Sequence, residues 1–128
     1  MKNKTVYIAL SVDVLHHGHI NLINHAKKYG KVIAGLLTDQ AISTQKRLPL
    51  LNFNQRKKIL ENINGIAKVV PQNEWEYSKN ILKFKPDYMV HGDDWKFGSE
   101  KHLRNSSIKA LKKIGGKLIE IAHTKDIS

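Results

Sequence analysis

The feature that most constrains the fold is an alternation of short apolar runs and amphipathic segments along the whole chain. Five apolar runs have the length and composition of buried strands, at residues 5–10, 31–37, 66–71, 87–92 and 117–122. Segments with helical periodicity lie between them, at residues 20–29, 55–63, 75–84 and 99–114. This order predicts an α/β fold with a doubly wound five-stranded parallel sheet, covered by helices on both faces.

Local signals place the ends of several of these elements. Gly30 is expected to end the first helix, and Asn52 or Asn54 is expected to cap the second. The polar stretch at 38–51 is interpreted as a loop that is long for a compact domain. Loops of that length are usually functional, so we expect this one to contribute to a site.

Length and composition limit the class of protein. With 128 residues and 41% hydrophobic content, residues 1–128 are expected to form a single domain. The absence of cysteine excludes disulfides, zinc–thiolate sites and a thiol nucleophile, and it suits a reducing cytoplasm. Residues 1–10 lack the long apolar region and small-residue cleavage site of a signal peptide, and no apolar stretch approaches the roughly 20 residues that span a bilayer. We therefore expect a cytoplasmic protein without membrane contact.

The formal net charge of +11 indicates that the partner or ligand is anionic. A basic module that binds nucleic acid is one candidate, and the pI near 9.9 fits it. The lysines are spread along the chain, however, without a clustered arm or an aromatic-lined basic stripe. This distribution favours anionic small ligands over nucleic acid.

The motif His16-His17-Gly18-His19 stands where the first strand gives way to the first helix. Residues three apart at a helix start point in the same direction, so His16 and His19 face one ligand together. A helix N-terminus adds unpaired N–H groups and the positive end of the helix dipole, and Gly18 lets a ligand approach the backbone. The motif therefore predicts a socket for phosphate.

Other polar clusters follow the same ends of the predicted strands. They are Ser11 and Asp13 after the first strand, Lys46 and Arg47 in the long loop, the segment 91–95 after the fourth strand and the segment 123–128 after the fifth. Ligands in doubly wound folds bind beyond the carboxyl ends of the strands. The clusters are thus expected to form one site.

These motifs together resemble the nucleotidyltransferases of the HxGH type, specifically the cytidylyltransferases, with their Rossmann-like nucleotidyltransferase fold. HHGH matches HxGH, GDDW is similar to the same motif of the glycerol-3-phosphate cytidylyltransferases, and HTKDIS stands in place of their RTEGIS. The segments KRLPLLNFNQRKKILENINGI, VVPQ and PDYMVHGDDW resemble the 2-aminoethylphosphonate cytidylyltransferases more closely. Those enzymes are often linked with phosphoenolpyruvate mutases in phosphonate synthesis.

The resemblance implies that CMP passes from CTP to a small phosphonate or phosphate, with release of pyrophosphate. It implies His16, His19 and Lys46 as catalytic residues and a divalent cation such as Mg²⁺, with Asp13 or Asp94 as its candidate ligands. It also implies a homodimer. The implied nucleotide-binding residues are Leu10, Ser11, Asp13, Gly18, Arg56, Gly92, Asp93, Asp94, Thr124, Ile127 and Ser128.

The expected acceptor is 2-aminoethylphosphonate, and glycerol 3-phosphate or phosphocholine is the alternative. An acceptor with a cationic group needs acidic or aromatic neighbours, for which Asp39, Trp75 and Tyr77 are candidates. Adenylyl transfer to a phosphopantetheine-like acceptor is a further reading of an HxGH site. A degenerate, non-catalytic transferase domain is the remaining alternative.

Two departures from the family pattern bear on activity. Leu10 replaces a glycine at the end of the first strand, and His123, Lys125 and Asp126 replace residues of the RTEGIS segment. The chain ends at Ser128, where the family begins a helix whose N-terminus faces the nucleotide. We therefore expect a domain truncated at its C-terminus, with weakened binding of CTP.

Overall fold

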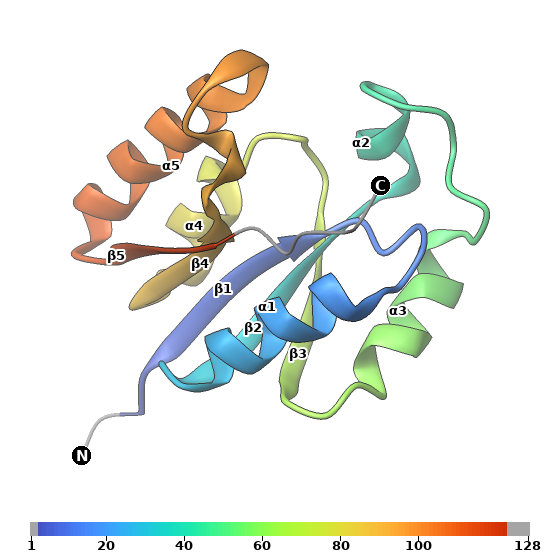
Figure 1. The fold of residues 1–128 in the computed structure, drawn as a ribbon, viewed down its shortest axis with the longest axis horizontal. Coiled ribbons are helices and arrows are strands. Elements are labelled where there is room, and N and C mark those ends of the chain that lie inside the picture. The colour runs from blue at the N-terminus through green and yellow to red at the C-terminus, as the bar shows by residue number, and fades with distance from the viewer. Residues whose placement is uncertain (1–2, 123–128) are drawn as a thin grey trace.

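The computed structural model describes residues 3–122, which include one five-stranded parallel sheet. The strands are β1 (Thr5–Leu10), β2 (Lys31–Leu37), β3 (Ile66–Gln72), β4 (Tyr88–Gly92) and β5 (Lys117–Ile121). They pair in the order β3-β2-β1-β4-β5, as Figure 1 shows. The predicted fold class is confirmed, and every predicted strand end lies within one residue of the observed end.

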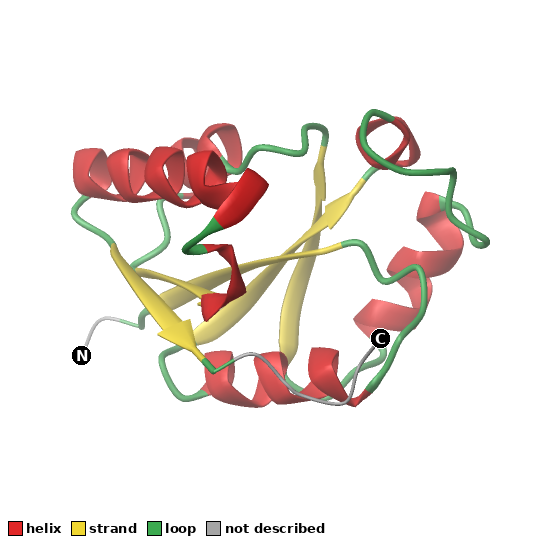
Figure 2. Ribbon diagram, turned by 45° about the horizontal axis from the view of Figure 1, so that its top comes forward, coloured by secondary structure: helices red, strands yellow, loops and turns green. Residues whose placement is uncertain are grey.

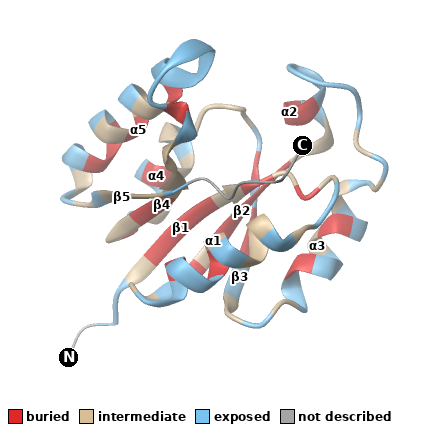
Figure 3. Cartoon of the chain, in the orientation of Figure 1, coloured by how far each residue is buried: buried red, intermediate tan, exposed pale blue. Residues whose placement is uncertain are grey.

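Helices cover both faces of this sheet (Figure 2). α1 (His17–Lys27) and α3 (Phe53–Glu61) pack on one face, while α4 (Ser78–Phe84) and α5 (Lys101–Ile114) pack on the other. The sheet is therefore the middle layer of three, and β1 and β2 are buried along most of their length (Figure 3).

Two apolar cores lie on the two faces of the sheet. The first joins β1 and β2 to Ile23 and Ala26 of α1 and Leu60 of α3. The second joins the sheet to Ile81 of α4 and Leu111 of α5. Alternate residues of each strand point to opposite faces, so neighbours such as Val6 and Tyr7 belong to different cores.

Helix α1 begins three residues earlier than the sequence pattern predicted. His16 is the N-cap, so the first helical residue is His17 and not Ile20. Asn52 caps α3, as one of the two predicted alternatives. α4 begins at Ser78, three residues later than predicted, and the N–H of Ser78 donates to the Glu76 carboxylate.

The stretch at 38–51 was predicted to be a loop throughout. It instead contains the short helix α2 (Asp39–Ser43). The Thr38 side chain accepts a hydrogen bond from the N–H of Ala41 and caps this helix. Ala41 and Ile42 are buried against Leu37, which stabilises the turn from the carboxyl end of β2. Two short 3₁₀ helices, η1 (Asp93–Trp95) and η2 (Gly98–Glu100), likewise replace loop after β4.

The sheet is joined unevenly at its centre. β1 pairs with β2 over six residue pairs, from Thr5–Lys31 to Leu10–Leu36. It pairs with β4 over only two, Val6–Tyr88 and Tyr7–Met89. Beyond Tyr7 the two strands no longer pair, and their carboxyl ends leave room for a ligand at the point where the strand order reverses. In residues 3–122, no helix is long and apolar enough to span a membrane.

Candidate active site

The HHGH motif forms the N-terminal cap of α1. His16 Nδ1 accepts a hydrogen bond from the N–H of Gly18 at 3.1 Å, and His19 Nδ1 accepts one from the N–H of His16 at 3.1 Å. These two bonds form a capping box in which imidazoles replace the usual hydroxyl and carboxylate groups. The motif thus satisfies part of its own helix end while it holds both rings in place.

The capping bonds fix the tautomer of both rings. A nitrogen that accepts a hydrogen bond carries no proton, so in each neutral imidazole the proton lies on Nε2. The rings of His16 and His19 stack with 4.0 Å between their centroids. Burial lowers the pKa of His19 to about 4, with a further contribution from the charge of His16. His19 is therefore a neutral N–H donor at neutral pH.

A pocket of about 200 Å³ opens beside this cap. His16, Gly18, His19 and Leu22 of α1 line one wall. The other lining residues come from the carboxyl ends of three strands or directly follow them, and are Ala9, His91, Gly92, Asp94, Ile121 and Ala122. The pocket thus lies where β1 and β4 separate, and it contains five of the predicted site residues.

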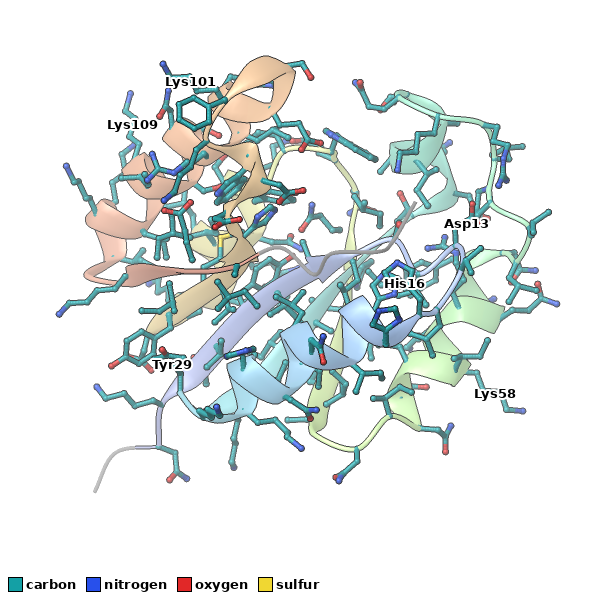
Figure 4. All side chains as sticks on the ribbon, in the orientation of Figure 1. Asp13, His16, Tyr29, Lys58, Lys101 and Lys109 are labelled. Atoms are coloured by element: carbon teal, nitrogen blue, oxygen red, sulfur yellow. The ribbon has the colours of Figure 1, made fainter. Side chains whose placement is uncertain are left out.

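Asp13 lies in the loop before α1 (Figure 4). It does not line this pocket. Its Oδ1 accepts the N–H of Leu50 at 3.0 Å, and its Oδ2 lies 3.1 Å from Arg47 Nη2. Asp13 therefore joins the β1–α1 loop to the loop before α3. Leu10 packs in the first core, where it is 6% exposed, and its side chain takes no part in the pocket.

Arg56 occupies a different place from the one expected for a residue that binds nucleotide phosphates. Its side chain is 0% exposed, so it is not a surface charge of α3. Its guanidinium donates to the carbonyls of Ser11, Leu37 and Leu51 and to the carboxylate of Asp39, at 2.6–3.1 Å. Arg56 thereby connects the carboxyl ends of β1 and β2.

The turn that follows β1 is strained at Val12. This residue is buried and has a φ of +53°, a region that β-branched side chains rarely adopt. Its two neighbours are held from outside the turn, Ser11 through the bond to Arg56 and Asp13 through the bonds to Arg47 and Leu50. These tertiary contacts stabilise a conformation that Val12 alone disfavours.

Lys46 does not line the pocket beside the histidines. Its ammonium lies 5.5 Å from the ring centroid of Trp75, in a cation–π contact. The two residues line a second depression together with Glu100 and His102. The structure therefore separates the predicted lysine from the predicted histidines.

His91 lines the pocket, and the sequence placed it in the segment 91–95 without assigning it an individual role. Its ring lies flat on the indole of Trp95, with 3.5 Å between centroids and 7° between planes. Trp95 is fully buried, and its Nε1–H donates to Glu120 at 2.7 Å. Arg104 holds the same carboxylate at 2.9 and 3.0 Å, and this lowers the pKa of Glu120.

The remaining predicted residues fall in two groups. Asp93 begins η1 next to the pocket without lining it. Thr124, Ile127 and Ser128 lie outside the described residues, as does the rest of the segment 123–128. Within residues 3–122, no group of three or more histidine or acidic residues could hold a metal ion.

Comparison with known proteins gives the family context of this site. The family model described as cytidylyltransferase-like matches residues 11–128. A glycerol-3-phosphate cytidylyltransferase from Bacillus subtilis (strain 168) is 35% identical over 85 residues, which are 65% of this chain and 66% of that protein. An FAD synthase from Ferroglobus placidus is 28% identical over 110 residues, which are 84% of this chain and 72% of that protein.

A solved structure supports the fold at a greater distance in sequence. The lipopolysaccharide core biosynthesis protein from Thermoplasma volcanium GSS1 superposes with a TM-score of 0.81 at 21% identity. The match covers 97% of this chain and 100% of that one. The three-layer architecture is thus shared with solved proteins, while the chain aligns with just under two thirds of the Bacillus relative.

Proposed function

Since this chain belongs to the cytidylyltransferase-like family, we propose that it transfers CMP from CTP to a small acceptor that bears a phosphonate or phosphate. An acceptor oxygen attacks the α-phosphorus of CTP, the bond from that phosphorus to the bridging oxygen breaks, and pyrophosphate leaves. No covalent enzyme intermediate is needed, which agrees with the lack of cysteine. The chain must therefore position the reactants and stabilise negative charge.

The observation that carries this proposal is the pair of Nε2–H donors at the start of α1. His16 and His19 both line the pocket, and their capping bonds leave Nε2–H as the free donor of each neutral ring. Donors held in place before the reaction stabilise developing phosphoryl charge without reorganising. The positive end of the α1 dipole acts in the same direction.

A divalent cation such as Mg²⁺ fits this site through one carboxylate of the pocket lining. Mg²⁺ commonly takes one or two protein carboxylates and completes its shell with substrate phosphates and water. Asp94 lines the pocket and would hold it, whereas Asp13 lies outside the pocket lining, where it contacts Arg47 and Leu50. When bound, the cation would neutralise charge on the phosphate oxygens.

For the acceptor we propose 2-aminoethylphosphonate. Its ammonium group suits the aromatic face of Trp75, where it would take the place of the Lys46 ammonium that now contacts the ring. Glu100 lines the same depression and adds negative charge. Of the other predicted neighbours, Asp39 is paired with Arg56, and Tyr77 packs against both His91 and Trp95.

Pyrophosphate release tests the reaction and the acceptor together. The assay uses CTP and Mg²⁺ with 2-aminoethylphosphonate, glycerol 3-phosphate or phosphocholine, and the expected result is release with 2-aminoethylphosphonate. Release only with another acceptor would reject the phosphonate and keep the transferase. CTP binding without release for any acceptor would support a degenerate domain. Tight, salt-sensitive binding of DNA or RNA in place of CTP would support the basic-module alternative.

The similarity to an FAD synthase favours one second candidate, adenylyl transfer from ATP. An HxGH cap binds the triphosphate and does not by itself select the base. ATP in place of CTP is therefore the nucleotide control in the same assay. Pyrophosphate release with ATP and none with CTP would show that ATP, and not CTP, is the nucleotide substrate.

The homodimer also stays part of this proposal. Val14, Leu48 and Leu50 are 60%, 62% and 76% exposed, and they lie in the two loops that Asp13 joins. Exposed apolar side chains that lie near one another are typical of contacts between copies of a protein. Light scattering on the wild type and on Leu50→Ser tests it, with a dimer expected only for the wild type.

A further inference from the structure

The two walls of the pocket differ in the hydrogen-bonding groups that they offer. On the α1 wall, His16 and His19 present Nε2–H donors because Nδ1 of each ring accepts from the backbone. On the β4 wall, His91 Nδ1 lies 2.8 Å from the carbonyl oxygen of Gly92. A carbonyl oxygen only accepts, so Nδ1 of His91 carries the proton and Nε2 carries a lone pair.

The neutral state of His91 is consistent with its surroundings. Burial lowers the pKa of His91, and the bond to Gly92 and the nearby acidic groups only partly oppose this effect. The ring is also fixed in orientation, because one face lies on Trp95 at 3.5 Å. Trp95 is in turn held by Glu120, which Arg104 clamps through two hydrogen bonds. His91 is thus a rigid acceptor and not a mobile surface imidazole.

A nucleoside triphosphate also has two parts that differ in their hydrogen-bonding groups. Its phosphate oxygens only accept hydrogen bonds at neutral pH, so they suit the donors of the α1 wall and are repelled by a lone pair. Its nucleoside part carries proton-bearing groups, namely ribose hydroxyls and, in cytosine, an exocyclic amine. Opposite polarity on the two walls therefore sets the direction in which the nucleotide lies.

We propose that His91 is a specificity-determining residue, whose Nε2 accepts a hydrogen bond from a proton-bearing group of the nucleoside. The inference rests on the proposed function, because it requires a nucleotide in this pocket. A buried acceptor left without a donor costs binding free energy, so nucleotides that lack the group are rejected.

Calorimetry without acceptor tests this inference on the full chain. The ligands are CTP, UTP, 2′-deoxy-CTP and 3′-deoxy-CTP with Mg²⁺, and the variants are His91→Met and His91→Gln. Methionine keeps an apolar side chain of similar length on Trp95, whereas glutamine keeps an acceptor oxygen. The control is His25→Met, an exposed histidine elsewhere on α1.

We expect His91→Met to weaken CTP binding about tenfold, the typical cost of one lost hydrogen bond. Binding of the one analogue that lacks the partner group should not change, so UTP identifies the base amine and a deoxy analogue identifies a ribose hydroxyl. His91→Gln should restore most of the discrimination. An equal loss for all four ligands, or no loss, would overturn the inference. Failure of the wild type to bind any of them would overturn the proposed function as well.

Discussion

The imidazole rings of His16 and His19 stack at 4.0 Å because each is hydrogen-bonded through Nδ1 to the first turn of the same helix. This arrangement forces two like groups together and directs both Nε2–H donors away from the backbone. Two neighbouring imidazolium rings would repel each other, so the contact also keeps the pair from being doubly charged.

Replacement of His19 by alanine should abolish most of the turnover while the fold survives. Loss of one preorganised donor to a developing oxyanion typically lowers kcat by about 10²–10³-fold. The lost cap costs only about 1 kcal/mol of folding free energy. Steady-state pyrophosphate release and thermal unfolding measure the two effects, and His25→Ala is the matched control. Turnover within twofold of the wild type would contradict the role of His19.

The stability of the protein should fall as the pH is lowered from about 6.5 to about 4. His19 has a pKa of about 4 in the folded state against 6.5 in the unfolded chain, so the unfolded state binds a proton that the folded state does not. Urea unfolding at pH 7.5 and 5 compares the wild type with His19→Gln, whose amide keeps an N3 acceptor in the capping box. The variant should lose less stability on acidification. An equal loss in both proteins would show that His19 does not titrate in this way.

Arg56→Met should destabilise the fold more than any surface substitution on α3. Removal of the guanidinium leaves the buried carbonyl of Leu37 and the carboxylate of Asp39 without this donor. A buried carbonyl left without its donor costs about 1–3 kcal/mol, and the Asp39 carboxylate, which is 39% exposed, adds less because water reaches it. Urea unfolding measures it, and Lys58→Met at an exposed position of the same helix should change the free energy of unfolding by less than about 0.5 kcal/mol.

Gly35→Ala tests the packing of β2 against β1. A Cβ at position 35 would overlap the phenol ring and hydroxyl of Tyr7. That hydroxyl donates to Gln72 and accepts from Asn80, so the ring cannot move without breaking buried hydrogen bonds. Overpacking of this kind costs about 1–3 kcal/mol. In a Tyr7→Leu background the cost of Gly35→Ala should largely vanish, and an unchanged cost would exclude Tyr7 as its cause.

The sequence could reveal the parts of this site that depend on local chemistry. The strands followed from apolar runs, and the imidazole pair followed from the position of HHGH between a strand and a helix. The start of α1 was predicted three residues late because histidine is an unusual cap. The helix α2 was missed because its stability comes from Ala41 and Ile42 packing on Leu37, a contact that exists only in the folded sheet.

The contacts of Arg56, Lys46 and His91 could not be predicted for a similar reason. Arg56 is on a lysine-rich helix, and its burial depends on carbonyls that β1 and β2 present side by side. Lys46 belongs to a stretch whose path is set by α2 and by Trp75. His91 becomes a lining residue only because β4 separates from β1 beyond Met89.

Because β4 separates from β1 beyond Met89, the sheet consists of two parts that pair only over a short length. On one side lie β1, β2 and β3, and on the other lie β4 and β5, joined at one end by the pairs Val6–Tyr88 and Tyr7–Met89 and by the hydrogen bonds between Thr5 and Asp87. A ligand that contacts both α1 and β4 bridges the two parts where their strands no longer pair. Amide hydrogens near Ala9 and Gly92 should therefore exchange more slowly once nucleotide is bound, because the ligand would then bridge the two parts of the sheet.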